Sequence, residues 1–332
     1  MSADKGAVML DRKYFYTSDD FTWHCMVSDE EQNEHVFTQF DKEIRQRWNA
    51  AVDASCFAYK LDHVEGRVVP GKYQIYIQHN EMRFNKRRQP QVMSSVSQPF
   101  NPDKFNFTKV KSKEVLTEES ILLALETSLL SNHRGFHVGF NSLCAHASVN
   151  HLHLHTWYSQ YPSYLESSEV SPICKDVFEV RNYPTNAFVF ELAPETDVCS
   201  LARKIHKVTT YFIENEIAHN FHIMRGTRCY SNSQINGAVC QEDGQRYSVL
   251  RVFLWPRNPV HGAKDLSSYQ SERRPIAVYE FAGSLAINTK EKYDSFTEDD
   301  FCAYLSRASL AEEVFIRHKE AIRELLSVKN AT

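Results

Sequence analysis

Apolar residues recur at helical spacing in several parts of the chain. After Thr117, the residues Ile121, Leu125 and Leu129 fall on one side of a helix, and the threonine side chain suits the N-cap position. Asp197 and Thr297 precede similar patterns. The sequence therefore predicts helices over residues 40–52, after Thr117, over 197–218, after Thr297 and over 312–328.

Other segments alternate apolar and polar residues, as β-strands do. Runs 136–140 and 149–158 lie close together, which favours an antiparallel pair joined by a loop. Strands and helices come in clusters with little β-α-β alternation, so the pattern predicts an α+β fold rather than a doubly wound parallel sheet. Residues 1–40 show no clear period and are expected to form a loosely ordered lead-in. The predicted strands are 73–78, 136–140, 149–158, 188–190, 221–224, 247–255 and 277–287.

Composition narrows the classes of function. The chain has 332 residues, 42% of them hydrophobic, and a net charge of -4. This charge excludes a strongly basic surface for nucleic acid, although it leaves specific phosphate sites open. No apolar run has the length of a membrane span or of a secretory signal, so we expect a cytoplasmic protein with no membrane partner. The eight cysteines form no C-x-x-C pair, which argues against a zinc ribbon and favours reduced thiols.

A row of alternating histidines is the main chemical signal. In a strand, His151, His153 and His155 would share one face, while the intervening leucines would point into the core. Such a row suits a metal site, because imidazole is a common transition-metal ligand. It also suits nucleophilic catalysis on a phosphate, in which one imidazole attacks phosphorus. No acidic residue stands between 136 and 164, which fits the phosphate chemistry better than the metal site.

The histidine row, together with segments around it, resembles the histidine triad superfamily and, within it, the GDP-D-glucose phosphorylases, which are related to the plant GDP-L-galactose phosphorylases. The resemblance extends from about residue 41 to the C-terminus. It is carried by Phe105-Asn106-Phe107-Thr108-Lys109-Val110, Gly139-Phe140-Asn141-Ser142-Leu143, Ala147-Ser148-Val149-Asn150-His151-Leu152-His153-Leu154-His155, Glu216-Ile217-Ala218-His219-Asn220 and Arg251-Val252-Phe253-Leu254-Trp255-Pro256-Arg257.

The resemblance implies an antiparallel sheet with flanking helices, arranged as two similar halves in one chain. The first half would cover residues 41–185 and the second 186–332. The implied reaction converts GDP-glucose and inorganic phosphate to GDP and glucose 1-phosphate. It would need no cofactor and no metal.

The resemblance also implies roles for individual residues. His153 would be the nucleophile and form a guanylyl-histidine, with its second ring nitrogen bonded to the carbonyl of His151. His155 would contact phosphate oxygens where charge develops. The implied nucleotide- or phosphate-binding residues are Asn141, Ser148, Arg87, Arg88 and Arg257.

The chain departs from this family at two places, the loop Cys144-Ala145-His146, where relatives carry small residues, and the Leu116–Thr117 junction. Relatives carry some tens of residues between Leu116 and Thr117, including strands of the first half, and here the two residues are adjacent. Three alternatives to an active phosphorylase therefore stay open: a histidine triad nucleotide hydrolase, a guanine-nucleotide-binding remnant without activity, and a zinc protein.

Overall fold

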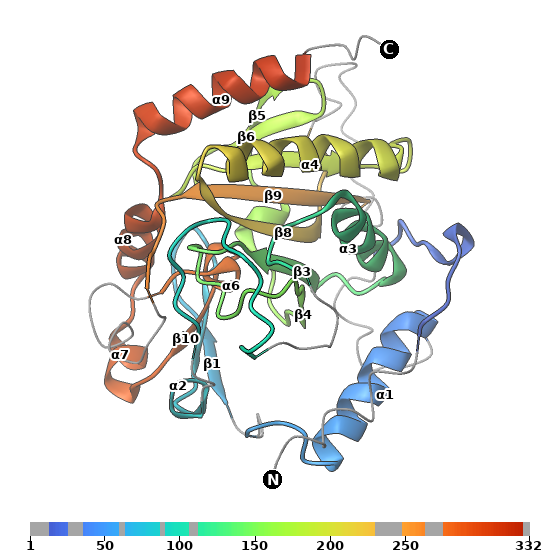
Figure 1. The fold of residues 1–332 in the computed structure, drawn as a ribbon. Helices are drawn as coiled ribbons and strands as arrows, with labels where there is room; N and C mark the ends of the chain where they lie inside the picture. The colour runs from blue at the N-terminus through green and yellow to red at the C-terminus, as the bar shows by residue number, and fades with distance from the viewer. Residues whose placement is uncertain are drawn as a thin grey trace.

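The computed structural model of the protein describes residues 13–25, 36–59, 64–86, 90–105, 112–229, 248–262 and 275–327. Its strands are β1 (Glu65–Val68), β2 (Tyr76–His79), β3 (Phe136–Asn141), β4 (His155–Tyr158), β5 (Val170–Cys174), β6 (Val177–Val180), β7 (Phe188–Leu192), β8 (Ala218–Gly226), β9 (Val249–Arg257) and β10 (Ser284–Ile287). Its α-helices are α1 (Gln39–Asp53), α2 (Met82–Asn85), α3 (Glu118–Leu130), α4 (Val198–Glu214), α6 (Val278–Phe281), α7 (Lys290–Ser295), α8 (Glu298–Ala308) and α9 (Glu312–Ser327), and 3-10 turns occur at Ser18–Asp20 and Tyr164–Glu166 (Figure 1).

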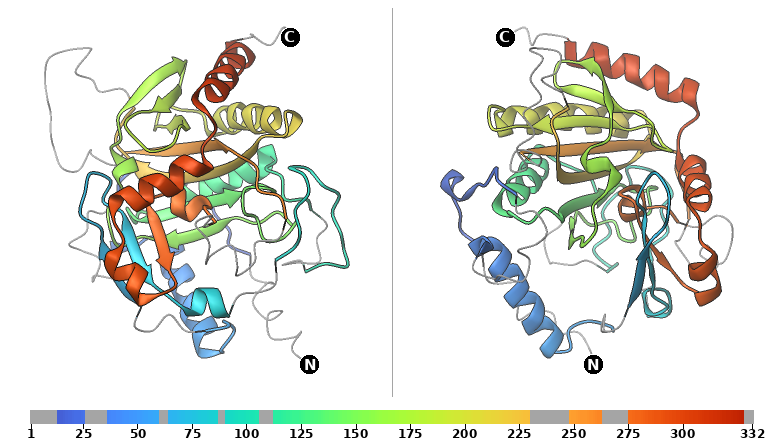
Figure 2. Two further views of the ribbon diagram at one scale, coloured as in Figure 1. Left: turned by 90° about the vertical axis from the view of Figure 1, so that its left-hand side faces the viewer. Right: turned by 180° about the vertical axis from the view of Figure 1, so that it is seen from behind.

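Seven strands form one antiparallel sheet in the order β4-β3-β8-β9-β7-β6-β5. A smaller sheet, in the order β1-β2-β10, lies beside it (Figure 2). The predicted α+β class, with an antiparallel sheet and flanking helices, is confirmed. Within the described ranges, no helix is both long and apolar enough to cross a membrane.

The two faces of the large sheet support two separate cores. Leu250, Val252 and Leu254 of β9 pack on one face with residues of α3, α4 and α9, whereas Phe253 and Trp255 pack on the other with residues of α8 and the small sheet. This follows from the period of two along a strand, which sends successive side chains to opposite faces. Both faces are covered, so apolar residues point to both sides of the strand, and its two arginines, Arg251 and Arg257, are buried as well.

A helix followed by two neighbouring antiparallel strands occurs twice in the fold, as α3-β3-β4 and as α4-β8-β9. The two units meet where β3 pairs with β8. This repetition fits the expected two similar halves, and the boundary near residue 185 stays a prediction. Beyond β9 the sheet continues through three more strands, whereas β4 is the edge strand on the other side among the described residues. The Leu116–Thr117 junction directly precedes α3, β3 and β4, the unit that forms this shorter side of the sheet.

The helix predictions are confirmed, including the caps. The side chains of Thr117, Asp197 and Thr297 accept hydrogen bonds from backbone N–H groups at the starts of α3, α4 and α8. The helix predicted over 197–218 ends earlier, since Ala218 already belongs to β8. Of the predicted lead-in, residues 13–25 lie against the core formed by α3 and α4, through Tyr14, Tyr16, Phe21 and Trp23.

Three strand predictions are only partly correct. Only 155–158 of the run 149–158 form a strand, and the pairing of β4 with β3 ends at His155, opposite Gly139. In the run 277–287, residues Val278–Phe281 form helix α6, and the strand begins after Gly283, which has a φ of 89°. The strand predicted over 73–78 corresponds to β2, which begins only at Tyr76, because Gln74 has a φ of 49° and is not extended. Strands β5 and β6 lie in a stretch for which the sequence predicts no strand.

Candidate active site

The histidine row lies on an irregular segment that leads into β4. Leu152 and Leu154 pack against the core under α3 and α4, so the leucines point inward as predicted. Of the histidines, His151 is buried and His155 is exposed. The three rings therefore extend from the interior to the surface, rather than forming one even row on a strand.

The ring of His153 is held by one of its two nitrogens. Its Nδ1 lies 2.9 Å from the backbone carbonyl oxygen of His151 and 3.0 Å from each carboxylate oxygen of Glu114. The carbonyl of His151 can only accept, and an ionised Glu114 is also an acceptor, so Nδ1 carries the proton. In the neutral ring Nε2 is then the nitrogen with the lone pair. The contact with the His151 carbonyl is the one that the family resemblance implies.

Glu114 is a site residue that sequence reasoning missed. It is fully buried, and its backbone N–H donates to the side-chain Oδ1 of Asn150 at 3.1 Å. Burial raises the pKa of this carboxyl to about 7, while the contacts with His153 act in the opposite direction. The residue lies far upstream of the histidines, at a bend in the loop before α3, and no periodicity or motif points to it.

A hydrogen-bond chain fixes the ring of His155. The Oδ1 of Asn141 accepts from the Nδ2 of Asn220 at 2.6 Å and from the backbone N–H of Val278 at 2.8 Å. These two donors fix the orientation of the Asn141 amide, so its Nδ2 donates to Nε2 of His155, 3.3 Å away. A neutral His155 therefore carries its proton on Nδ1. Its ring lies 4.8 Å from that of His153, measured between centroids.

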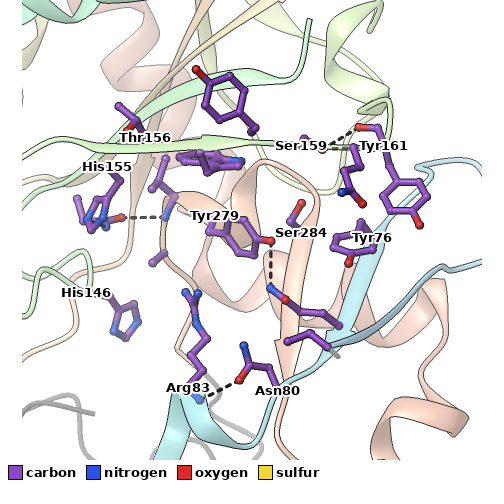
Figure 3. Close-up of a pocket in the computed structure, with 18 of the residues that line it drawn as sticks. Tyr76, Asn80, Arg83, His146, His155, Thr156, Ser159, Tyr161, Tyr279 and Ser284 are labelled. Carbon is purple, nitrogen blue, oxygen red and sulfur yellow. Dashed lines mark hydrogen bonds between the residues drawn. The ribbon is translucent and has the colours of Figure 1, made fainter. Parts of the chain in front are cut away.

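A cavity of about 590 Å³ opens beside His155, between β4, helix α6 and the small sheet. Three of the predicted site residues line it: Asn141, Ser148 and His155. Figure 3 shows His146 and His155 at one end of this cavity and Tyr76 and Tyr161 at the other. The remaining walls combine aromatic rings, amides, hydroxyls and one guanidinium. The residues that supply these groups include Trp157, Tyr279, Gln78, Asn80, Thr156, Ser284 and Arg83.

Among the described residues, none of the predicted arginines lines this cavity. Arg257 is buried, and its guanidinium donates to the backbone carbonyls of Asn258 and Ile276. Phosphate binding by Arg257 stays a prediction. In the structure, its hydrogen bond to Ile276 joins the end of β9 to the segment before α6. Arg87 and Arg88 lie outside the described residues.

Behind the cavity wall, two further histidines form a buried pair across the β3–β8 junction. The Nδ1 of His137 lies 2.8 Å from the Nε2 of His222, and their rings stack with Trp157 and Trp255. Burial lowers the pKa of His137 to about 3 and that of His222 well below its usual value, so both rings are neutral. Over the part of the chain that the structure describes, no group of three or more His, Cys, Asp or Glu residues is arranged to hold a metal ion.

The sheet and helices define a fold of the histidine triad type. The structure is similar to that of yeast Ap4A phosphorylase Apa2, with a TM-score of 0.51 and 12% sequence identity over 82% of this chain and 95% of that one. The chain belongs to the GDPGP1-like family, whose N-terminal domain model matches residues 39–118 and 113–157 and whose C-terminal domain model matches residues 171–329.

Curated relatives match over most of their length. This chain is 27% identical to GDP-D-glucose phosphorylase 1 of Xenopus laevis, over 91% of this chain and 93% of the relative. It is 28% identical to that of Danio rerio, over 94% and 98%, and 24% identical to GDP-L-galactose phosphorylase 1 of Arabidopsis thaliana, over 81% and 70%. The two matches to the N-terminal model overlap at residues 113–118, a range that includes the Leu116–Thr117 junction.

Proposed function

We propose that this protein is a GDP-D-glucose phosphorylase, which transfers the GMP group of GDP-glucose to inorganic phosphate and yields GDP and glucose 1-phosphate. The names of the relatives that match over most of the chain support this activity. The observation that carries the proposal is the orientation of His153, whose Nδ1 is hydrogen-bonded to the His151 carbonyl and to Glu114. That arrangement leaves Nε2 as the nucleophilic atom of the ring.

The reaction then has two steps. In the first, Nε2 of His153 attacks the α-phosphorus, and glucose 1-phosphate leaves with the electron pair of the broken P–O bond. In the second, an oxygen of inorganic phosphate attacks the same phosphorus, the N–P bond breaks, and GDP is released. His155 and Ser148 line the cavity, and the ring of His155 neighbours that of His153, which supports a role for both in contacting phosphate oxygens during the two steps.

The cavity beside His155 is suited to the hexose phosphate half of the substrate. Trp157 and Tyr279 offer aromatic faces, and Gln78 and Ser284 offer hydrogen-bonding groups of the kind that hydroxyls need. Arg83 supplies a guanidinium that can compensate phosphate charge. Leaving glucose 1-phosphate and incoming phosphate would occupy this space in turn.

We place the reaction in the cytoplasm. Among the described residues, Cys144, Cys174, Cys199, Cys229 and Cys302 are reduced thiols, which suits a reducing compartment.

Labelling tests the proposed intermediate directly. The full chain is incubated with α-labelled GDP-glucose without phosphate and quenched in alkali, because a phosphoramidate on histidine survives base and is cleaved by acid. We expect label on His153, discharged as GDP when phosphate is added. The His153→Ala variant should carry no label and show no turnover, whereas His206→Ala, on α4, should behave as the wild type.

The products separate this activity from the alternatives. Release of GMP at a rate that does not depend on phosphate would identify a nucleotide hydrolase. A folded protein that binds GDP but acquires no label would be a binding remnant, and the proposed function would then be wrong.

A further inference from the structure

The carboxylate of Glu114 has no part in the chemistry that the family resemblance implies, yet it lies against the proposed nucleophile. Both of its oxygens are 3.0 Å from Nδ1 of His153. The Glu114 side chain is fully buried, and 14% of the His153 side chain is exposed. The contact therefore joins the interior of the protein to a ring that reaches the surface.

The backbone around Glu114 is held firmly in place. The side chain of Asn150 accepts the backbone N–H of Glu114 and donates to the carbonyls of Gln98 and Pro99 at 3.1 and 2.9 Å. Asn150 directly precedes His151, so one buried amide ties the carboxylate segment to the histidine row. Leu116, two residues further on, is buried in the core beside α3.

A buried carboxylate is unfavourable unless something compensates its charge. His153 is the titratable group that acts on the Glu114 carboxyl, and the rings of His151 and His155 are neighbours of His153. Burial and the neighbouring His153 lower the pKa of His151, which favours its neutral form. Asn150 contributes neutral groups only. His153 is thus the group that can supply a positive charge next to the carboxylate.

The proposed reaction creates such a charge. When the Nε2 lone pair forms the bond to phosphorus, the leaving oxygen takes the electrons of the P–O bond, and the ring keeps its proton on Nδ1. The guanylyl-imidazole is then a cation. When phosphate attacks in the second step, the electrons of the N–P bond return to the ring, and the positive charge disappears.

We propose that Glu114 is a positioning residue, which fixes the Nδ1–H tautomer of His153 and whose ionised carboxylate stabilises the cationic guanylyl-histidine. The inference rests on the proposed function, because it assigns Glu114 a part in that same two-step transfer. The arrangement has the logic of a carboxylate that orients and stabilises a catalytic imidazole in hydrolases. It differs in that the imidazole itself forms the covalent bond.

The protonation of Glu114 should appear in the pH dependence of turnover. Burial raises the pKa of its carboxyl to about 7, so the ionised form dominates above that pH. Turnover of the wild type should therefore fall as the pH decreases below about 7, as the carboxylate takes up a proton.

The test compares Glu114→Gln, Glu114→Asp and the wild type as full-length chains. Glu114→Gln keeps the size of the buried side chain and removes its charge. We expect kcat to fall about 100-fold, with a KM for GDP-glucose changed less than about threefold, since carboxylates that act on a catalytic imidazole contribute factors of about this size or larger. The acidic limb near pH 7 should be lost or displaced in Glu114→Gln, whereas Glu114→Asp should keep it and recover part of the rate. Glu126→Gln, on α3, is the control for loss of a partly buried carboxylate.

Two readouts distinguish failure of this inference from failure of the proposed function. The rate of labelling of His153 by α-labelled GDP-glucose reports the transfer, and the NMR resonance of the His153 Nδ1 proton reports the contact without any substrate. A downfield Nδ1 proton in the wild type that moves upfield in Glu114→Gln, together with slower labelling, would support the inference. Equal labelling rates and the same pH profile in both proteins would overturn it while the proposed function stands. Absence of label from the wild type would overturn both.

Discussion

The substitution Glu114→Gln should make the protein more stable at neutral and alkaline pH. In the wild type, folding moves an ionisable carboxyl from water to a fully buried position. The pKa of that carboxyl rises from 4.5 to about 7. Between these two values the native state retains a proton that the unfolded chain has released. Rising pH therefore favours unfolding over this interval, and the effect is complete above about pH 7.

The size of the effect follows from the interval. At about 1.4 kcal/mol for each pH unit, a pKa that moves from 4.5 to about 7 corresponds to about 3 kcal/mol. The glutamine side chain does not titrate and carries no such dependence. The free energy of unfolding of Glu114→Gln, minus that of the wild type, should thus rise by about 3 kcal/mol from pH 4.5 to pH 8.

Urea unfolding of both proteins, followed by tryptophan fluorescence at half-unit steps from pH 4.5 to 8, measures this difference. Groups that titrate alike in the two proteins cancel, so the difference reports the Glu114–His153 pair as a unit. A difference that does not depend on pH would refute the burial argument. A variant that is less stable than the wild type at pH 8 would mean that the ionised pair is net favourable. Combined with the loss of turnover expected above, added stability would identify Glu114 as a residue at which stability and activity conflict.

Three further outcomes follow from the site and its supports. Asn141→Ala leaves two buried N–H donors without their acceptor, at about 1–3 kcal/mol each, and should lower the urea midpoint while turnover falls through loss of the bond to His155. Gly139→Ala would place a Cβ 3.0 Å from the ring of Trp157 and closer still to α6, so thermal unfolding should reveal a loss of about 1–3 kcal/mol. In the folded protein, burial keeps His137 and His222 neutral, whereas in the unfolded chain each histidine binds a proton below its ordinary pKa of 6.5. The free energy of unfolding should therefore fall as the pH decreases below 6.5. His222→Gln should reduce that fall in urea titrations, and an unchanged acid sensitivity would contradict the assignment.

Local signals explain which parts of the fold could be predicted. The caps at Thr117 and Asp197 are short-range, since each side chain bonds to a backbone group three residues ahead, and these helices are found where the sequence places them. The irregular path of His151 was not predictable from its neighbours. The residues before His155 lie outside the β3–β4 ladder, and the extent of a ladder between two strands is a property of the tertiary structure.

The same distinction holds for the site. The contact of His153 with the carbonyl of His151 is local and was anticipated through the family resemblance. The contact with Glu114 joins residues 39 positions apart, and the cavity walls come from β2, β10 and α6 as well as β4. The sequence-based prediction that 277–287 is a strand placed Tyr279 on a sheet rather than on the helix that faces the cavity. Reading the chain one segment at a time cannot find a wall built by elements that lie far apart in the sequence.

The order of the strands also bears on how the chain is completed during synthesis. β9 is the last strand of the large sheet to be made, yet it lies in the middle, with nine residue pairs to β8 on one side and five to β7 on the other. Until it emerges from the ribosome, β4-β3-β8 and β7-β6-β5 have no strand between them. Both nascent groups then expose an apolar edge, which is prone to pair with other chains. A chain that stops before residue 249 should therefore aggregate rather than leave a smaller folded protein. It would contain the complete histidine row but lack β9, the strand that joins the two groups of strands into one sheet.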